Sequence, residues 1–292
     1  MDIITFFTTH PLVFLFFALL LGLIIGSFLN VVIYRLPLMM QRDWSKQCYE
    51  FLELDSKQKI NENLKSFNLL YPGSHCPKCQ HEITAFENIP VLSFLMKGGK
   101  CKNCKKSISL RYPIVESMTG VFTLLVAYQY GYDWLTLALL ILTWSLIVLA
   151  MIDYDHQLLP EDITTPILWL GLIINYFGLI TTLEASVLGA IAGYLILWAV
   201  YWVFKLLTGK EGMGYGDFKL LAALGAWMGW EVLPQIILLS SLIGALTGII
   251  IIMIKGGDKN MPISFGPYLA GAGFVSLLWS DKLSQMYTLV FF

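Results

Sequence analysis

Two short acidic segments carry the residue types best suited to chemistry. Asp153 lies in the run 153–156, Asp-Tyr-Asp-His, which closes an apolar segment. Asp217 follows the glycine-rich run 212–216, Gly-Met-Gly-Tyr-Gly, and opens another apolar segment. Glycines allow close backbone approach and positive φ values, so this run can bring Asp217 against another part of the chain. We expect Asp153 and Asp217 to meet in space as a catalytic pair.

Two carboxyl groups that share one proton are suited to hydrolysis of a peptide bond. The ionised group takes a proton from water and the protonated group polarises the carbonyl, while like-charge repulsion keeps one proton on the pair. We expect Asp217 to cap the helix that follows it, where the helix dipole favours the anion, and Asp153 to lie at a helix C-terminus, where the dipole disfavours it. The sequence thus predicts Asp217 as the base and Asp153 as the acid. The simpler alternative is that both are helix caps in polar loops.

Four of the five cysteines form two CxxC pairs separated by 21 residues. Tetrahedral zinc accepts four thiolates, and four protein ligands leave no open position, so the pattern predicts a structural zinc site. Glycines at 98 and 99 give the chain freedom to turn before the second pair. Unrelated thiol pairs or a redox role are the alternatives, and Cys48 is expected to be a bystander. The predicted ligands are Cys76, Cys79, Cys101 and Cys104.

The composition indicates that these residues lie in a membrane protein. The chain has 292 residues, of which 57% are hydrophobic and 13% charged, whereas soluble domains carry about 25% charged residues. We therefore predict an all-α polytopic membrane protein. Its expected partner is the lipid bilayer, and no nucleic-acid partner is expected. About eight apolar segments are long enough to cross a bilayer as helices. They are 12–33, 113–131, 134–152, 163–181, 185–207, 217–233, 234–254 and 263–281.

The basic residues predict how these spans are oriented. Of the 19 Lys and Arg residues, 13 lie between Arg35 and Arg111, which places this insertion in the cytoplasm. Both termini are then outside, and Asp153 and Asp217 lie at the cytoplasmic face. The predicted parts are a first transmembrane helix (1–33), a cytoplasmic four-cysteine insertion (34–112) with a short helix in 42–67, and a seven-helix membrane domain (113–292).

Several other charged residues lie close to these features. Glu116 falls within a predicted span and needs a partner, with Arg111 or Lys219 as candidates. Lys219 is close enough to Asp217 in sequence to tune its charge or to meet a lipid headgroup. The acids at 155, 161 and 162 are expected in a solvated loop.

These motifs resemble, from end to end, the bacterial type IV prepilin peptidases, the GxGD-type membrane aspartic proteases. The likeness includes residues 26–37 at the exit of the first span, both CxxC pairs, and the segments 87–90 and 111–116. It continues through 153–160, 212–217 and the segment Pro-Ile-Ser-Phe-Gly-Pro at 262–267. One departure is Leu-Pro-Glu-Asp at 159–162, where the family often has Leu-Pro-Asp.

The resemblance implies two activities at the inner membrane of a bacterium. One is cleavage, after a glycine, of the basic leader of type IV prepilins and type II secretion pseudopilins, with Asp153 and Asp217 as catalytic residues. The other is methylation of the new N-terminal residue with S-adenosylmethionine, an activity linked in the family to the four-cysteine insertion. No motif in the sequence indicates which residues bind S-adenosylmethionine. The acids at 155, 161 and 162 could attract the leader's positive charge.

Three other functions remain as alternatives. A membrane methyltransferase would use the aspartates only as helix caps. A proton-coupled transporter would have acids near the middle of the bilayer, whereas here they gather at one face. A non-catalytic assembly factor would use the zinc insertion to dock a partner.

Overall fold

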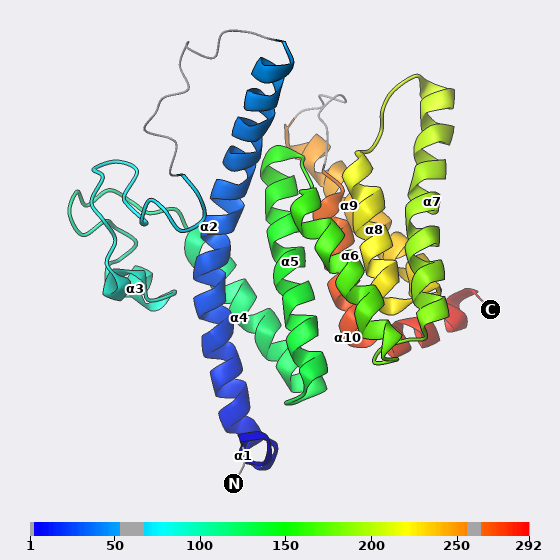
Figure 1. Cartoon of the computed structure of the whole chain (residues 1–292), viewed down its shortest axis with the longest axis horizontal. Coiled ribbons are helices and arrows are strands. Elements are labelled where there is room, and N and C mark those ends of the chain that lie inside the picture. The colour runs from blue at the N-terminus through cyan, green and yellow to red at the C-terminus, as the bar shows by residue number, and fades with distance from the viewer. Residues whose placement is uncertain (1–2, 53–66, 256–263, 292) are drawn as a thin grey trace. The chain divides into compact units, whose positions relative to one another are not determined.

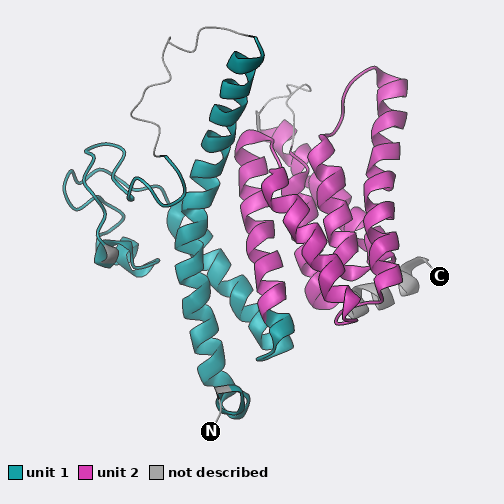
Figure 2. Cartoon of the chain, in the orientation of Figure 1, with its two compact units in different colours: residues 1–136 teal, residues 137–292 magenta. Residues whose placement is uncertain are grey.

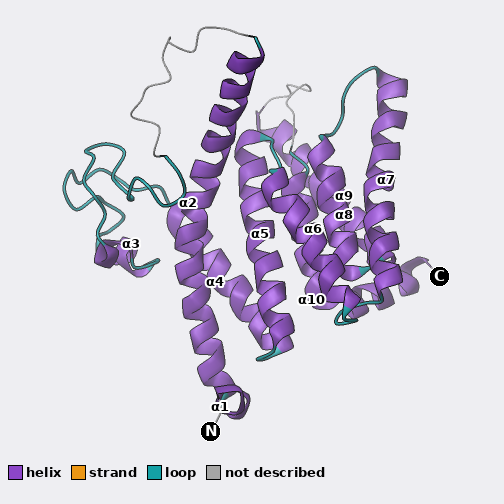
Figure 3. Cartoon of the chain, viewed as in Figure 1, coloured by secondary structure: helices purple, strands orange, loops and turns teal. Residues whose placement is uncertain are grey.

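The structure is a computed structural model and describes residues 3–52, 67–255 and 264–291. All regular secondary structure in these ranges is helical (Figure 3). The extended pairing within them is limited to two isolated bridges, His75–Glu82 and Lys100–Ser107. The all-α prediction is therefore confirmed for this part of the chain.

The chain divides into two compact units, residues 1–136 and 137–292 (Figure 2). The sequence predicts a finer division, with boundaries after residues 33 and 112, and that division stays a prediction. The first unit holds the cysteines and the second holds both aspartates.

The first unit is built on two long helices. It consists of α1 (Ile3–Thr9), α2 (Pro11–Phe51), the 3-10 helix η2 (Ala85–Asn88), α3 (Leu92–Met96) and α4 (Arg111–Tyr130). Glycines let α2 and α4 pack backbone to backbone, as small residues do between membrane helices. A Cβ atom on Gly26 would lie 2.8 Å from the Cα atom of Glu116.

Helix α2 is longer than the sequence predicts. It runs for 41 residues through Pro37 to Phe51. Residues 42–51 are therefore helical, as the sequence predicts for part of 42–67, but they continue α2 and do not form a helix of their own. Residues 53–66 lie outside the described residues. A helix of this length spans about 60 Å, against a hydrocarbon core of about 30 Å. Hydropathy marks where a chain leaves lipid, and a charged sequence can continue the same helix into water.

The second unit is a helical bundle around α8 (Figure 1). Helix α8 (Tyr215–Met228) packs against α6 (Glu161–Tyr176), α7 (Leu183–Thr208) and α10 (Gly266–Phe291). All its residues from Asp217 to Met228 are buried except Lys219. The unit is completed by α5 (Trp134–His156), the 3-10 helix η3 (Trp230–Val232) and α9 (Leu233–Lys255).

Four helices among the described residues are long and apolar enough to cross a membrane. They are Pro11–Phe51, Trp134–His156, Leu183–Thr208 and the segment Trp230–Ile254. The outer faces of α7 and α9 carry rows of exposed apolar side chains, including Leu188, Ile191, Leu195, Leu246, Ile249 and Ile250. A water-facing surface rarely carries such rows, so they fit contact with lipid tails.

Helices α7 and α8 touch through Gly189 and Gly225, and this contact supports a stability prediction. A Cβ atom on Gly225 would overlap the carbonyl group of Gly189, and backbone cannot move aside as a flexible side chain can. We expect Gly225→Ala to lower the free energy of unfolding by about 3 kcal/mol. Thermal unfolding in detergent measures the effect. Gly271→Ala is the matched control, because a Cβ atom there meets nothing within 4 Å; equal midpoints for the two variants would contradict the prediction.

Candidate active site and metal centre

Asp153 and Asp217 come from two different helices and line one pocket. Asp153 lies in the last turn of α5 and Asp217 in the first turn of α8. The pocket has a volume of about 250 Å³, and its wall also includes the glycine-rich loop and the two residues that precede α10. Both side chains are buried, and their charges interact. The structure thus brings together the two carboxylates that the sequence predicts as a pair.

The hydrogen bonds of the two carboxylates differ. Asp153 Oδ2 accepts a hydrogen bond of 2.9 Å from the backbone N–H of Gly266, at the start of α10. Asp217 Oδ1 is buried and has no hydrogen-bond partner among the described residues. The expectation that Asp217 caps α8 is wrong, because Gly214 is the N-cap and Asp217 is the third residue of the helix.

The glycine-rich loop works by close approach of the backbone and not by unusual backbone angles. Of the two properties that glycine allows, close approach and positive φ, the loop uses only the first, since none of its three glycines has a positive φ. A Cβ atom on Gly216 would lie 2.7 Å from Cβ of Leu159, and one on Gly212 would lie 2.7 Å from the Phe204 ring. The missing side chains let this loop lie against the segment that follows α5 and against the end of α7.

The charged residues near the pocket are paired with one another. Lys219 donates to Glu161, on α6, and not to Asp217. Glu211, which lines the pocket, accepts a hydrogen bond of 2.8 Å from Lys205. That lysine lowers the pKa of the Glu211 carboxyl. Glu211 and Glu161 therefore each already have a lysine partner.

The four predicted metal ligands form one cluster. Their sulfur atoms all lie within 4.8 Å of one another, and no second group of this kind occurs in the described ranges. The Cys76–Cys104 and Cys79–Cys101 sulfur pairs are each 3.9 Å apart. This is far from the disulfide length of about 2.05 Å and close to the ~3.8 Å edge of a tetrahedron with Zn–S bonds of about 2.3 Å. The cluster could hold a metal ion, while Cys48 is exposed and apart from it.

Each CxxC pair lies in the same kind of turn. In the first, the Gln80 N–H donates to the Cys76 carbonyl, and in the second the Lys105 N–H donates to the Cys101 carbonyl. Gln80 and Lys105 both have positive φ, near 60°. The N–H groups of Lys78 and Cys79 lower the pKa of the Cys76 thiol from 9.0 to about 6, which favours the thiolate that a metal binds. As expected, Gly98 and Gly99 turn the chain with positive φ values before the second pair.

Comparison with known proteins assigns this arrangement to a family. Residues 20–130 match the profile of the bacterial peptidase A24 N-terminal domain. Residues 140–249 match that of the type IV leader peptidase family. The chain is 55% identical to the prepilin leader peptidase/N-methyltransferase of Stutzerimonas stutzeri, over 97% of each chain. The chain belongs to the type IV leader peptidase family.

Other members of the type IV leader peptidase family are almost as similar. The protein of Pseudomonas aeruginosa with the same name is 51% identical over 98% of each chain. That of Neisseria gonorrhoeae is 49% identical over 91% of each chain. No solved structure matches the chain.

Two contacts of this family member are not those that the sequence suggests. Glu116 Oε2 accepts a 2.7 Å hydrogen bond from the backbone N–H of Val91, whereas the sequence proposes Arg111 or Lys219. The second contact is that of Gly266 with Asp153. Gly266 belongs to the motif at 262–267, to which the sequence assigns no role. No periodicity or spacing rule relates these partners, because the fold alone brings together segments far apart in the chain.

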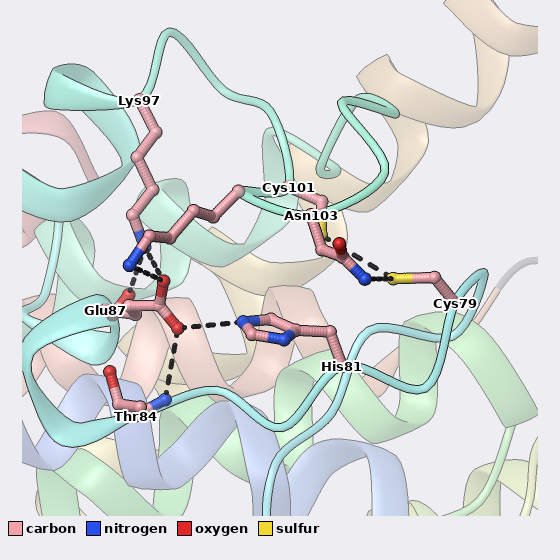
Figure 4. A network of polar contacts seen from close by, with 8 residues as sticks. Cys79, His81, Thr84, Glu87, Lys97, Cys101 and Asn103 are labelled. Carbon is pink, nitrogen blue, oxygen red and sulfur yellow. Dashed lines mark hydrogen bonds and ion pairs between the residues drawn. The ribbon is translucent and has the colours of Figure 1, made fainter.

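Glu87 organises the insertion beside the cysteines (Figure 4). It accepts a hydrogen bond from the Thr84 N–H at 3.3 Å and contacts His81 at 3.3 Å. The ammonium groups of Lys97 and Lys102 lie 3.6 and 3.5 Å from its Oε1 atom. The Thr84 N–H, then His81 and the two lysines, lower the pKa of the Glu87 carboxyl from 4.5 to about 2.

This network predicts a pH-dependent stability of the insertion. The pKa of Glu87 is lower in the folded protein, so its contribution is complete above about pH 4.5 and is lost as the pH falls towards 2. Glu87→Gln removes the charge at every pH. We expect the variant's insertion to be cut faster than the wild type's in limited proteolysis at pH 7, by about tenfold, which corresponds to one unit of the pKa difference, with the difference vanishing towards pH 2. A difference that is independent of pH would contradict this role. Glu82→Gln, in the same insertion, is the control.

Proposed function

We propose that this chain removes the leader peptide of type IV prepilins with Asp153 and Asp217 as its catalytic pair and then methylates the new N-terminus. The observation that carries the proposal is that the two carboxylates, from α5 and α8, line one pocket. The relatives named prepilin leader peptidase/N-methyltransferase support both activities. Type II secretion pseudopilins are proposed as further substrates.

The chemistry requires one ionised and one protonated carboxyl group. The ionised group takes a proton from a water molecule, whose oxygen forms a bond to the carbon of the scissile carbonyl. The protonated group donates a hydrogen bond to the carbonyl oxygen as negative charge develops there. The C–N bond then breaks, and the departing amine takes the proton that the first carboxyl group removed from water. The pair ends the cycle with one proton, as it began.

The proposed setting is the cytoplasmic face of the bacterial inner membrane. We propose the eight spans and the outward termini deduced from the sequence, with α4, α6, α8 and α10 joining the four long apolar helices. Helix α8 has 14 residues and rises only about 21 Å, less than the hydrocarbon thickness of about 30 Å. A helix this short cannot reach both surfaces of the hydrocarbon layer. Its Asp217 end would lie near the cytoplasmic surface, at the depth proposed for the scissile peptide bond of the prepilin.

The cysteine cluster is proposed to hold a structural zinc ion. Four thiolates fill the tetrahedral shell, so the ion would stabilise the insertion and would not bind substrate. Cys76, Cys79, Cys101 and Cys104 are the proposed ligands. S-adenosylmethionine is the proposed methyl donor, and no residue is assigned to it. The three domains predicted from the sequence belong to the same proposal.

The contacts refine the idea that exposed acids attract the basic leader. Glu161 is already bound to Lys219, so it would have to exchange partners to hold a leader lysine or arginine. Asp162 is exposed and is the stronger candidate for that role. Both belong to the first turn of α6.

The function is tested with the purified full-length protein in nanodiscs, a prepilin and S-adenosylmethionine. Mass spectrometry of the pilin N-terminus reads both reactions in one sample. We expect a product that has lost its leader and carries one added methyl group. Methylation without cleavage would favour the alternative of a membrane methyltransferase. No change at the N-terminus would leave the transporter or the assembly factor.

A further inference from the structure

The backbone N–H of Gly266 is the donor that reaches Asp153. Gly266 is the first residue of α10. The next residue is Pro267, which has no N–H, and the N–H groups of Tyr268 and Leu269 already donate to the Phe265 carbonyl. In the first turn of a helix the N–H groups need partners from outside the helix. Asp153, 113 residues away in sequence, supplies that partner at 2.9 Å.

The contact leaves no room for a side chain at position 266. A Cβ atom there would lie 2.6 Å from Asp153 Oδ2 and 3.0 Å from its Cγ atom. Glycine is therefore required here by close approach of the carboxylate and not by a positive φ. The positive end of α10 lies beside the same carboxylate and favours its negative charge.

The Oδ1 atom of the Asp217 carboxyl group has no hydrogen-bond donor comparable to the Gly266 N–H. This atom is buried without a hydrogen-bond partner in the described part of the chain. On the loop side the backbone N–H of Gly214 interacts with the Asp217 carboxyl group, but this contact leaves the buried Oδ1 atom without a donor. A buried carboxylate oxygen without a donor is costly when the group is charged and much less costly when it is protonated.

We infer that Gly266 is a positioning residue whose N–H group holds Asp153 as the ionised carboxylate, so that Asp153 takes the proton from water and Asp217 carries the shared proton. The inference rests on the proposed aspartate mechanism and deepens it. It reverses the roles that the sequence predicts, because that prediction counted only the helix to which each residue belongs. The N-terminus of a third helix, α10, determines which of the two carboxyl groups is ionised.

The other charged groups at the pocket do not supply this asymmetry. The titratable residues in its wall are Asp153, Asp217 and Glu211. Glu211 is paired with Lys205 at 2.8 Å. The segment before α10 contributes Ser264 and Phe265, which carry no charge. The difference between the two aspartates therefore lies in their backbone donors: Asp153 accepts a 2.9 Å hydrogen bond from the Gly266 N–H, whereas the Oδ1 atom of Asp217 has no donor in the described part of the chain.

The test compares Gly266→Ala with Gly271→Ala in the full-length protein in nanodiscs. Both substitutions add one methyl group to α10, but only the first meets Asp153. We expect kcat for prepilin cleavage to fall about 10- to 100-fold in Gly266→Ala with KM unchanged, because the carboxylate acts in the transition state. Gly271→Ala is expected to behave as the wild type. Thermal unfolding of both variants checks that they are folded.

The pH profile of kcat identifies which carboxylate is charged. If Asp153 is the ionised partner, loss of the N–H contact moves the acidic limb to higher pH and leaves the alkaline limb in place. If Asp217 is the ionised partner, the acidic limb stays and only the alkaline limb moves, because the N–H group then stabilises only the doubly charged pair. The second result, or an unchanged profile, overturns the inference.

A second variant removes the donor without adding a side chain. Incorporation of glycolic acid in place of Gly266 replaces the N–H group by an ester oxygen, and the same movement of the acidic limb is expected. Asp153→Asn and Asp217→Asn in the same assay separate two kinds of failure. If they still cleave, the proposed aspartate mechanism fails. If they are inactive while both position-266 variants keep the wild-type profile, only the present inference fails.

Discussion

Asp153→Asn and Asp217→Asn are each expected to lower the rate of prepilin cleavage by roughly 1000-fold or more. An amide has nearly the same shape as a carboxyl group but can neither take a proton from water nor give one up. Each substitution leaves the other aspartate in the pocket without the partner that shares its proton. Mass spectrometry of the pilin N-terminus measures the loss.

The control for these variants is Asp162→Asn. Asp162 lies in the first turn of α6, is exposed and is not part of the pocket wall. We expect it to retain cleavage, with at most a higher KM if it attracts the leader. Both aspartate variants should still methylate a pilin from which the leader has already been removed. Cleavage that persists in both would mean that the pair are helix-end residues and that another group performs the hydrolysis.

The pairing of Asp153 with Asp217 could be predicted because the ends of apolar segments mark positions along the bilayer normal. One aspartate closes a predicted span and the other opens one, so two residues far apart in sequence are expected at the same depth. The pocket that both line agrees with this argument. The cysteine cluster could be predicted for a different reason, since a CxxC turn is a local structure that needs no knowledge of the fold.

The partners of these residues could not be predicted in the same way. Lys219 is bound to Glu161, 58 residues away, and Asp153 is bound to Gly266. Neither pairing follows a helical or strand period, because the first joins α8 to α6 and the second joins α10 to α5. The length of α2 was missed for another reason. Hydropathy falls where the helix leaves the membrane, but the helix itself continues to Phe51.

The metal cluster carries the second large effect, and Cys76→Ser is expected to abolish both zinc binding and methylation. A serine hydroxyl is not a thiolate, so the tetrahedral shell loses one of its four ligands. Outside the helices, the described insertion has only two isolated bridges for pairing, and each lies beside one CxxC turn. We therefore expect folding of this segment to depend on the proposed zinc ion. Metal analysis of the purified protein and the methylation of pre-cut pilin measure the two losses.

Cys48→Ser separates loss of the cluster from loss of a thiol in general. Cys48 is exposed in α2 and lies apart from the four clustered sulfur atoms, so this variant should keep its zinc and both activities. Leader cleavage should continue in Cys76→Ser, because Asp153, Asp217 and the rest of the pocket wall all belong to the unit formed by residues 137–292. Retention of zinc and methylation in Cys76→Ser would exclude the four-cysteine site. Loss of cleavage together with methylation would show that the aspartate pair depends on the folded insertion. The two activities would then not be separable.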